Sequence, residues 1–132
     1  MGMSIRVGLR REMDYVVSEN DAPKFLLDKG VGVLSTPRMI ALMEGNSKRL
    51  LDQFLGEEYT SVGIHVDVYH KAPAPVGSRV KFVSEIIEVK KNKVLFKVKC
   101  VLNDIVVGEG IHERAIVSWN KFIEHVKKIM GK

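Results

Sequence analysis

A change in hydrophobic period near residue 56 constrains the fold more than any other feature of this sequence. Before it, Pro37–Leu55 carries apolar residues at helical spacing, on nearly all sides in its first half, which predicts one long buried helix ending at Gly56. After it, apolar residues recur at every second position, which predicts strands. The alternating segments are Ser61–Lys71, Arg79–Lys90, Val94–Leu102 and Ile105–Trp119. Consecutive strands joined by short turns favour antiparallel pairing, and one buried helix against such a sheet is an α+β fold.

Shorter elements are predicted on both sides of this unit. Arg11–Ser18 alternates as a short strand, and Pro23–Lys29 is typical of a short helix or lid-like segment. At the other end, apolar residues recur at helical spacing over Trp119–Ile129, which predicts a C-terminal amphipathic helix. In the second alternating segment the apolar positions change phase after Ile86, which predicts a β-bulge.

Length and composition limit the architecture and the compartment. A chain of 132 residues with 45% hydrophobic content can form one domain with a real core, which we expect to span residues 1–132. Cys100 is the sole cysteine, so an intrachain disulfide or a cysteine-based zinc cluster is excluded, and a reducing, cytoplasmic compartment is expected. Met1–Arg11 lacks the apolar core of a signal peptide, and no apolar run approaches the ~20 residues of a membrane span.

The charge balance is basic, with 21 basic and 16 acidic residues and a formal net charge of +5. Such a surface attracts anions, whether nucleic acid, phosphate, a coenzyme tail or an acidic membrane face. The densest basic cluster is formed by Lys90, Lys91, Lys93, Lys97 and Lys99. Aromatic residues make up 7% of the chain and do not interleave with these lysines, so base stacking is poorly supported and no nucleic-acid partner is expected.

Four stretches in order resemble motifs of the hotdog-fold acyl-CoA thioesterases, most closely the fluoroacetyl-CoA thioesterase group. They are Ser35–Glu44 (STPRMIALME), Gly63–His70 (GIHVDVYH), Ala72–Gly77 (APAPVG) and Gly110–Ala115 (GIHERA). Their order and spacing are the specific part of the likeness, which runs over nearly the whole chain. The resemblance implies an antiparallel sheet wrapped around one long central helix, a homodimer or higher homo-oligomer with sites at the interface, and no cofactor.

The resemblance implies catalytic roles for Thr36, His70 and Glu44, and each residue also has a plainer interpretation. Thr36 precedes Pro37 and is most simply the helix N-cap. The two roles are compatible, because the free backbone N–H groups of a helix N-terminus can hold a thioester oxygen as it becomes negative. In the group that this chain resembles, the matching threonine is a nucleophile or positions water, and a hydroxyl in that role needs a base.

His70 is the candidate general base, and Glu44 is its candidate electrostatic partner. His70 shares its strand phase with Val66, as a core histidine would, but it stands just before a Pro-rich turn, and sites gather at strand ends. Glu44 lies inside an otherwise apolar helix, where a carboxylate is either paired or partly exposed. Eight residues separate it from Thr36, about 12 Å along the axis, so a histidine ring or water has to link them.

By resemblance, Gly63 and Arg114 bind substrate together with His70. A glycine in a strand lets a ligand approach the backbone closely, although it also marks a bulge. Arg114 can pair with a coenzyme phosphate or a carboxylate, or form a surface ion pair with Glu113 or Glu109.

The expected function is hydrolysis of a short or medium acyl-CoA to a carboxylic acid and CoA. Fluoroacetyl-specific members of the group use aromatic residues in the lid, whereas this lid segment has only Phe25. A noncatalytic acyl-CoA-binding or ligand-sensing hotdog module is the alternative, acyl-carrier-protein thioesters stay open as substrates, and no motif supports a hydratase. No metal is expected, since His65, His112 and His125 have spacings that match no ligand motif.

Overall fold

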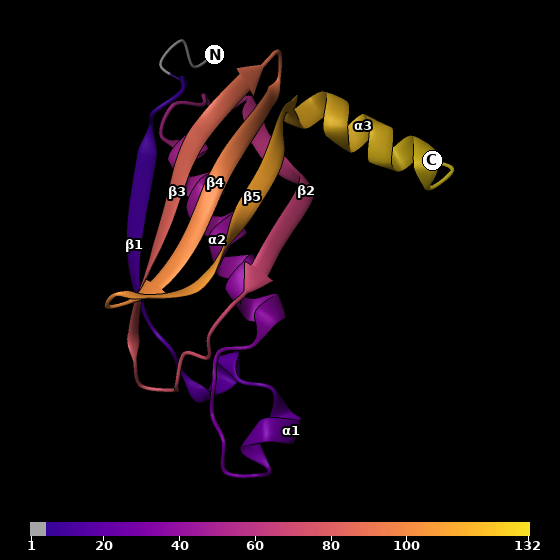
Figure 1. Ribbon diagram of the computed structural model, residues 1–132. Coiled ribbons are helices and arrows are strands. Elements are labelled where there is room, and N and C mark those ends of the chain that lie inside the picture. Colours follow the sequence, from indigo (N-terminus) through magenta and orange to yellow (C-terminus); the bar gives the residue numbers. More distant parts are fainter. Residues whose placement is uncertain (1–4) are drawn as a thin grey trace.

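The computed structural model describes residues 5–132, and the first four residues of the predicted domain lie outside this range. Five strands form one antiparallel sheet in the order β1-β3-β4-β5-β2 (Figure 1). They are β1 (Arg10–Val16), β2 (Tyr59–His70), β3 (Arg79–Lys90), β4 (Lys93–Leu102) and β5 (Ile105–Ser118). The long helix α2 (Thr36–Asp52) lies across one face of this sheet. The predicted α+β class is therefore confirmed.

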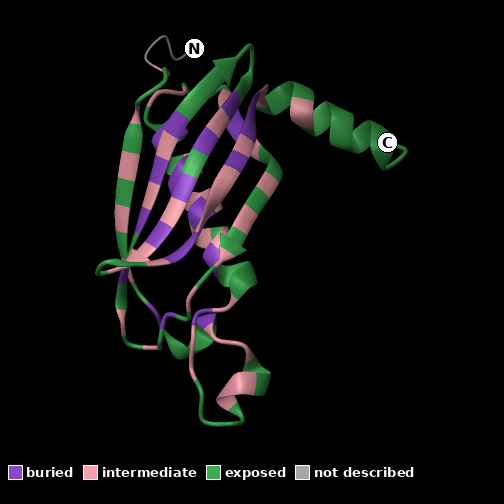
Figure 2. Cartoon of the chain, viewed as in Figure 1, coloured by how far each residue is buried: buried purple, intermediate pink, exposed green. Residues whose placement is uncertain are grey.

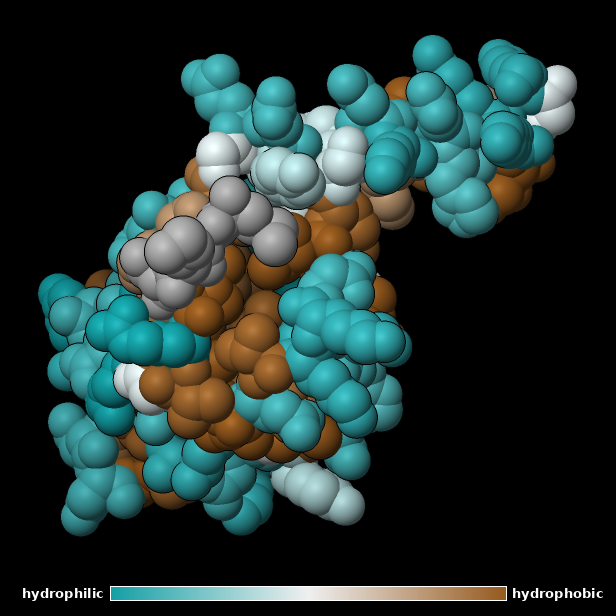
Figure 3. All heavy atoms as spheres, turned by 90° about the horizontal axis from the view of Figure 1, so that it is seen from above, coloured by the Kyte–Doolittle hydropathy of each residue, from teal (hydrophilic) through white to brown (hydrophobic). Residues whose placement is uncertain are grey.

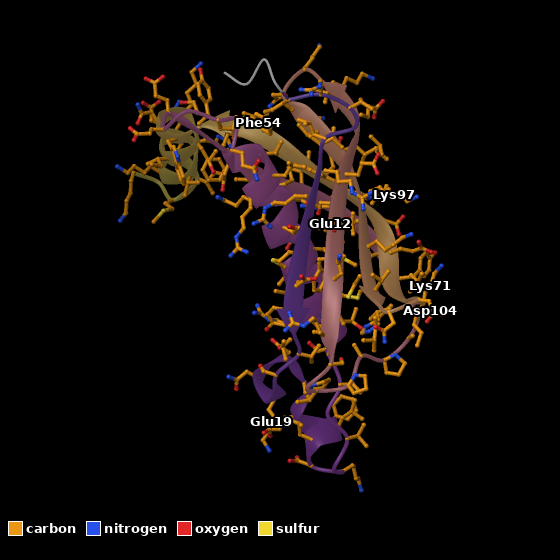
Figure 4. All side chains as sticks on the ribbon, turned by 90° about the vertical axis from the view of Figure 1, so that its left-hand side faces the viewer. Glu12, Glu19, Phe54, Lys71, Lys97 and Asp104 are labelled. Carbon is orange, nitrogen blue, oxygen red and sulfur yellow. The ribbon has the colours of Figure 1, made fainter. Side chains whose placement is uncertain are left out.

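The core lies between α2 and the sheet (Figure 2). β4 shows how the period of two produces it, because Val94, Phe96 and Val98 are fully buried while Lys97 points away from α2 (Figure 4). The buried apolar residues that α2 contributes are Met39, Met43, Leu50 and Leu51. Burying each large apolar side chain stabilises the fold by about 1.5–3 kcal/mol, so this face holds the helix on the sheet.

A polar seam also joins α2 to the sheet. Asn46 and Ser47 are fully buried, and both reach Ser84 on β3. The Asn46 Nδ2 group donates to the Arg11 carbonyl at 3.0 Å and to Ser84 Oγ at 3.2 Å, while the Ser47 and Ser84 hydroxyls lie 2.8 Å apart. The opposite side of the helix is exposed at Arg38 and Arg49. The prediction of a helix buried on nearly all sides is wrong, because the sheet covers only one face of it.

Both ends of α2 differ from the prediction. Ser35 is the N-cap, since its hydroxyl accepts a hydrogen bond from the Arg38 N–H at 3.1 Å, so the capping role predicted for Thr36 is wrong. The helix ends at Asp52 rather than Leu55, because the Phe54 N–H turns back to the Leu51 carbonyl in a tighter turn.

Two strands contain bulges. In β3 the register shifts between Ile86 and Glu88, which confirms the bulge predicted from the phase change. In β2 the register shifts between Gly63 and His65, and Ile64 is 45% exposed instead of continuing the buried face. A glycine allows this local kink, so the bulge interpretation of Gly63 is confirmed.

The two ends of the molecule carry the smaller helices. Below the sheet in Figure 1, the 3-10 helix η1 (Glu19–Asp21) and the helix α1 (Lys24–Leu27) form the start of a lid segment, residues 19–34. α1 is shorter than the predicted Pro23–Lys29 segment. At the opposite end, α3 (Trp119–Ile129) follows its predicted range but projects from the body of the molecule and buries none of its residues (Figures 1 and 3). Within residues 5–132, no helix has the length and apolarity needed to cross a membrane.

Candidate active site

A cavity of about 760 Å³ lies at the end of the sheet where β2 stops, beside α1 and the start of α2. Its walls are mainly apolar, with Phe25, Leu26 and Val33 supplied by the lid segment. Thr36 and His70 line the same cavity. Phe25 is 70% exposed, so the lid segment of one chain covers this cavity only in part.

Thr36 and His70 are in contact, although 34 positions separate them in the chain. The Thr36 Oγ1 atom lies 2.7 Å from the His70 Nδ1 atom. Because Ser35 caps the helix, the Thr36 hydroxyl is not needed for capping and can donate to an unprotonated Nδ1. The fold therefore joins the start of α2 to the end of β2 through one hydroxyl–imidazole contact.

The environment of His70 favours its neutral form. Burial lowers the pKa of His70 below its ordinary value of 6.5, and the backbone of Ala72 offsets part of that effect. The Nε2 atom is buried and has no hydrogen-bond partner among the described residues. A neutral ring that carries its proton on Nε2 leaves Nδ1 as the acceptor for the Thr36 hydroxyl, which is the arrangement a general base requires.

A buried carboxylate fixes the start of α2. Asp21 is only 3% exposed and accepts hydrogen bonds from the Tyr15 hydroxyl, the Ser18 N–H and the Arg38 Nε–H at 2.7–2.8 Å. Its backbone carbonyl also accepts from the Ser35 N–H at 2.8 Å. Burial raises the pKa of Asp21, but these hydrogen bonds outweigh it and hold the pKa below its ordinary value. The link from Asp21 to α2 was not predicted from the sequence.

Glu44 lies in a second cluster, away from Thr36 and His70. A Cβ atom built on Gly63 would lie 2.8 Å from Glu44 Oε2, 3.2 Å from His112 Cε1 and 3.4 Å from Arg114 Nη1. Three side chains therefore converge on the space that the missing side chain of Gly63 leaves open. The fold brings Gly63, Glu44 and Arg114 together, and it places Thr36 and His70 apart from them.

Arg114 is buried in this cluster rather than paired with a surface glutamate. It is 5% exposed, and its Nε–H donates to Ser61 Oγ at 2.8 Å while Nη2 donates to the Ser61 carbonyl at 2.9 Å. Burial lowers the pKa of Arg114, and the negative charges of Glu44 and Asp52 oppose that effect. The surface ion pair considered for Arg114 is thus wrong, because the guanidinium is buried and bound to Ser61 of the neighbouring strand β2.

The distance between the two clusters is large within one chain. Seven residues of β2 separate Gly63 from His70, which at ~3.3 Å each is about 23 Å. Thr36 and Glu44 are about 12 Å apart along α2, and no described residue links the Glu44 carboxylate to the His70 ring. A catalytic set of Thr36, His70 and Glu44 is therefore not assembled by a single chain.

Sequence analysis considered His112 only as a metal ligand and missed its place at the centre of the second cluster. It is 1% exposed and contacts Arg114 and the backbone of His65. Its place two residues before Arg114 in a strand was the available signal, because alternate residues share a face. Among residues 5–132, no group of three or more histidine, cysteine or acidic side chains is placed to hold a metal ion.

Comparison with known proteins gives concordant matches. The family described as fluoroacetyl-CoA-specific thioesterase matches residues 17–120. The fluoroacetyl-CoA thioesterase of Streptantibioticus cattleyicolor is 28% identical over 130 residues, which cover 94% of each chain.

Solved structures agree over a similar length. A hot-dog-like protein from Thermanaerovibrio acidaminovorans is 28% identical, covers 97% of this chain and 95% of its own, and has a TM-score of 0.88. A mutant of a fluoroacetyl-CoA-specific thioesterase, in complex with fluoroacetate and CoA, is 28% identical, covers 89% and 99%, and has a TM-score of 0.82. The sheet and central helix described above are those of the hotdog fold, as the resemblance implied.

Proposed function

The chain belongs to the fluoroacetyl-CoA-specific thioesterase family, so it is a thioester hydrolase that acts on acyl-CoA, and we propose that its acyl group is short or medium in length. The apolar cavity of about 760 Å³ supports this size, because cavities of this order bury a small ligand. Phe25 is the one aromatic residue of the lid segment, which supports a general acyl group over fluoroacetyl alone.

The observation that carries the mechanism is the 2.7 Å contact between Thr36 Oγ1 and His70 Nδ1 at this cavity. In our proposal His70 accepts a proton at Nδ1, either from the Thr36 hydroxyl or from a water that Thr36 holds. The freed oxygen bonds to the acyl carbon, and the positive end of the α2 helix dipole stabilises the negative carbonyl oxygen. The C–S bond then breaks, and the proton passes from His70 to the departing sulfur. If Thr36 itself attacks, water releases the acid in a second step.

The separation of the two clusters supports a homodimer. β2 forms one edge of the sheet, and its backbone can pair with a second copy about a two-fold axis. When the axis passes midway between Gly63 and His70, antiparallel pairing of β2 with its copy sets Gly63 of one strand opposite His70 of the other. In that arrangement Gly63, Glu44 and Arg114 of one protomer lie toward Thr36 and His70 of the second. The dimer then completes a site that one chain leaves divided.

Exposed apolar side chains support the same proposal. Ile64 and Tyr69 on β2 are 45% and 70% exposed. α3 starts beside the first residues of β2, where the Trp119 N–H donates to the Glu58 carbonyl, and it extends past the edge of the sheet (Figure 1). Its exposed apolar residues are Trp119, Ile123, Val126 and Ile129. A second protomer along β2 would cover these side chains.

A panel of acyl-CoAs from acetyl to long-chain, with fluoroacetyl-CoA included, tests the proposed activity by release of free thiol. Thr36→Ala and His70→Ala should each lower kcat by about 100-fold or more while the proteins stay folded, because each removes a group that moves the proton. Circular dichroism serves as the folding control. A folded variant that keeps near wild-type turnover would contradict the role assigned to that residue.

The alternative class gives a different outcome in the same experiment. A noncatalytic acyl-CoA-binding module would bind acyl-CoA in calorimetry without releasing thiol from any member of the panel. We further infer a reducing compartment, supported by the use of a single cysteine, Cys100, which is free.

A further inference from the structure

His112 makes polar contacts at both of its ring nitrogens. Nδ1 lies 2.9 Å from the carbonyl oxygen of His65, across the β2–β5 pairing. Nε2 lies 3.1 Å from the Nη1 atom of Arg114. The ring is 1% exposed and stacks on Phe96, with centroids 6.2 Å apart and planes 24° from parallel. Packing and two polar contacts thus hold one orientation of the imidazole.

The partners of these nitrogens decide where the proton lies. A backbone carbonyl can only accept, so Nδ1 carries the hydrogen. A guanidinium can only donate, so Nε2 must be the acceptor. His112 is therefore neutral with its proton on Nδ1, because a protonated ring would turn an N–H group toward an N–H group of Arg114. The pKa of His112 lies below its ordinary value, mainly because the ring is buried. The His65 carbonyl and the Glu44 charge raise the pKa in part, and the charges of Arg114 and His65 lower it further.

The contact between Arg114 Nη1 and His112 Nε2 is the third that holds the guanidinium in place. Of its five N–H groups, Nε–H and one Nη2–H bind Ser61, and one Nη1–H binds His112. Nη1, with its second N–H group, lies beside the open space at Gly63, 3.4 Å from the position of the absent Cβ. Glu44 and Asp52 are the negative charges that face the guanidinium. Without His112, the guanidinium plane could tilt about its two contacts with Ser61 and carry Nη1 toward Glu44.

We propose that His112 is a positioning residue, whose unprotonated Nε2 holds the Arg114 guanidinium at one orientation beside Gly63 so that the acyl-CoA meets a fixed cation. This inference rests on the substrate-binding role proposed for Arg114. His112 acts through Arg114 and takes no part in moving protons at Thr36 or His70. Its effect belongs to the affinity for substrate rather than to the chemical step.

The tautomer is tested first, on the wild-type protein and without substrate. Two-dimensional NMR of protein labelled with nitrogen-15 in histidine distinguishes Nδ1–H, Nε2–H and doubly protonated rings. We expect His112 to be neutral with the proton on Nδ1, and to remain so at pH values where an ordinary histidine, with a pKa of 6.5, is charged. An Nε2–H or doubly protonated ring at pH 7 would overturn the proposal, whatever the enzyme hydrolyses.

Two substitutions then separate positioning from packing. In His112→Gln the side-chain carbonyl can occupy the place of Nε2 and accept from Arg114, whereas in His112→Asn the shorter amide can bind the His65 carbonyl but cannot reach Arg114. His112→Asn should raise KM for the best acyl-CoA about tenfold or more with a smaller change in kcat, as expected for a lost hydrogen bond to a charged group. His112→Gln should restore KM to within about threefold of the wild type.

The double variant with Arg114→Met shows whether the effect passes through the guanidinium. In the Arg114→Met background, His112→Asn should change KM no further. If His112→Asn raises KM equally in the wild-type and Arg114→Met backgrounds, His112 only packs. The same conclusion follows if the Asn and Gln variants change KM equally at matched stability. If His112→Asn does not fold, two measurements decide whether His112 positions Arg114. They are the KM of His112→Gln and the nitrogen-15 NMR signals of His112 in the wild type and in Arg114→Met. If the wild type releases no thiol, dissociation constants for acyl-CoA replace KM, so failure of the activity does not conceal the result.

Discussion

Ser35 and Thr36 are adjacent hydroxyl residues with different partners, and this difference determines what Thr36 can do. Ser35 binds the Arg38 N–H and caps α2, which leaves the Thr36 hydroxyl beside His70. At the same scale, Gly63 acts through a missing side chain, because Glu44, His112 and Arg114 converge on the space a Cβ would fill. The Thr36 hydroxyl oxygen is decisive in the first case, and the absent Cβ of Gly63 is decisive in the second.

Gly63→Ala should lower kcat/KM about tenfold or more and destabilise the protein by about 1–3 kcal/mol. Its Cβ would lie 2.8 Å from Glu44 Oε2, a flexible carboxylate that can move, and 3.2 Å from Cε1 of the His112 ring, which is held in one orientation. Gly45→Ala is the matched control, since nothing lies within 4 Å of its Cβ and alanine in a helix should add about 1 kcal/mol of stability. Unfolding in urea and thiol release measure both properties. Equal activity of the two variants would contradict the importance of the open space at Gly63.

The value of kcat/KM should follow the fraction of His70 that is unprotonated as the pH changes. Burial lowers the pKa of His70 from 6.5, so the neutral base persists below pH 6.5 and activity falls only as the pH drops through this lowered pKa. The profile of kcat/KM reports the pKa of the free enzyme. An acidic limb centred at or above pH 6.5 would be inconsistent with His70 as the buried base. The residual activity of His70→Ala should lack this limb.

At the scale of elements, α2 connects the parts of the molecule that the site needs. Its N-terminus is tied to the lid segment through Asp21, and its middle carries Glu44 toward β2 and β5. The polar seam of Asn46 and Ser84 fixes its rotation against the sheet, because buried polar groups must meet specific partners. The helix thus sets both the position of Thr36 and the face on which Glu44 lies.

Ser35→Ala should destabilise the protein by about 1 kcal/mol, because the Arg38 N–H loses its capping partner. Equilibrium unfolding in urea measures the change. Ser35→Asp should retain most of the stability, since a carboxylate also accepts at an N-cap and interacts favourably with the helix dipole. Thiol release should fall with Ser35→Ala if fraying of the first turn moves Thr36 away from His70. Loss of the same stability in Ser35→Asp would show that capping is not the cause.

Across the described part of the molecule, residues 5–132, the β2 edge and α3 both leave apolar side chains exposed. A view from above shows α3 projecting from the body (Figure 3), and β2 presents Ile64 to solvent. Contiguous exposed apolar surface in a folded chain marks an interaction site. The proposed homodimer accounts for both surfaces and for the division of the site within one chain.

Ile64→Glu should weaken the dimer at least about tenfold, because it would place an unpaired charge in the interface. Ile87→Glu is a matched control, since Ile87 is 40% exposed on β3, an inner strand, against 45% for Ile64 on the edge. Sedimentation equilibrium across a range of concentrations gives the association constants. Equal association of the two variants would exclude β2 as the interface. Activity should fall with dissociation in Ile64→Glu.

The candidate residues differ in how far the chain predicts their surroundings. Thr36, His70, Gly63 and Arg114 are visible as motif positions, and Thr36 and His70 do meet. Glu44 is also a motif position, but its neighbours come from β2 and β5 rather than from the cavity that Thr36 lines. Burial and partners of this kind depend on how strands align, which spacing alone does not specify.

Local order in this protein follows from residues that are close in the chain. The switch from helical to alternating periodicity predicts α2 and the strands after it, and the phase change after Ile86 predicts the bulge in β3. Turn and capping preferences act over a few residues, and they are readable for the same reason.

Contacts between distant residues follow a different rule. Thr36 meets His70, and His112 meets Arg114 beside Glu44, because the sheet order and register bring separate segments together and exclude water around them. These contacts are stabilised by burial and pairing in the folded chain. The periodicity of the sequence does not predict them, because it describes only residues that are close in the chain.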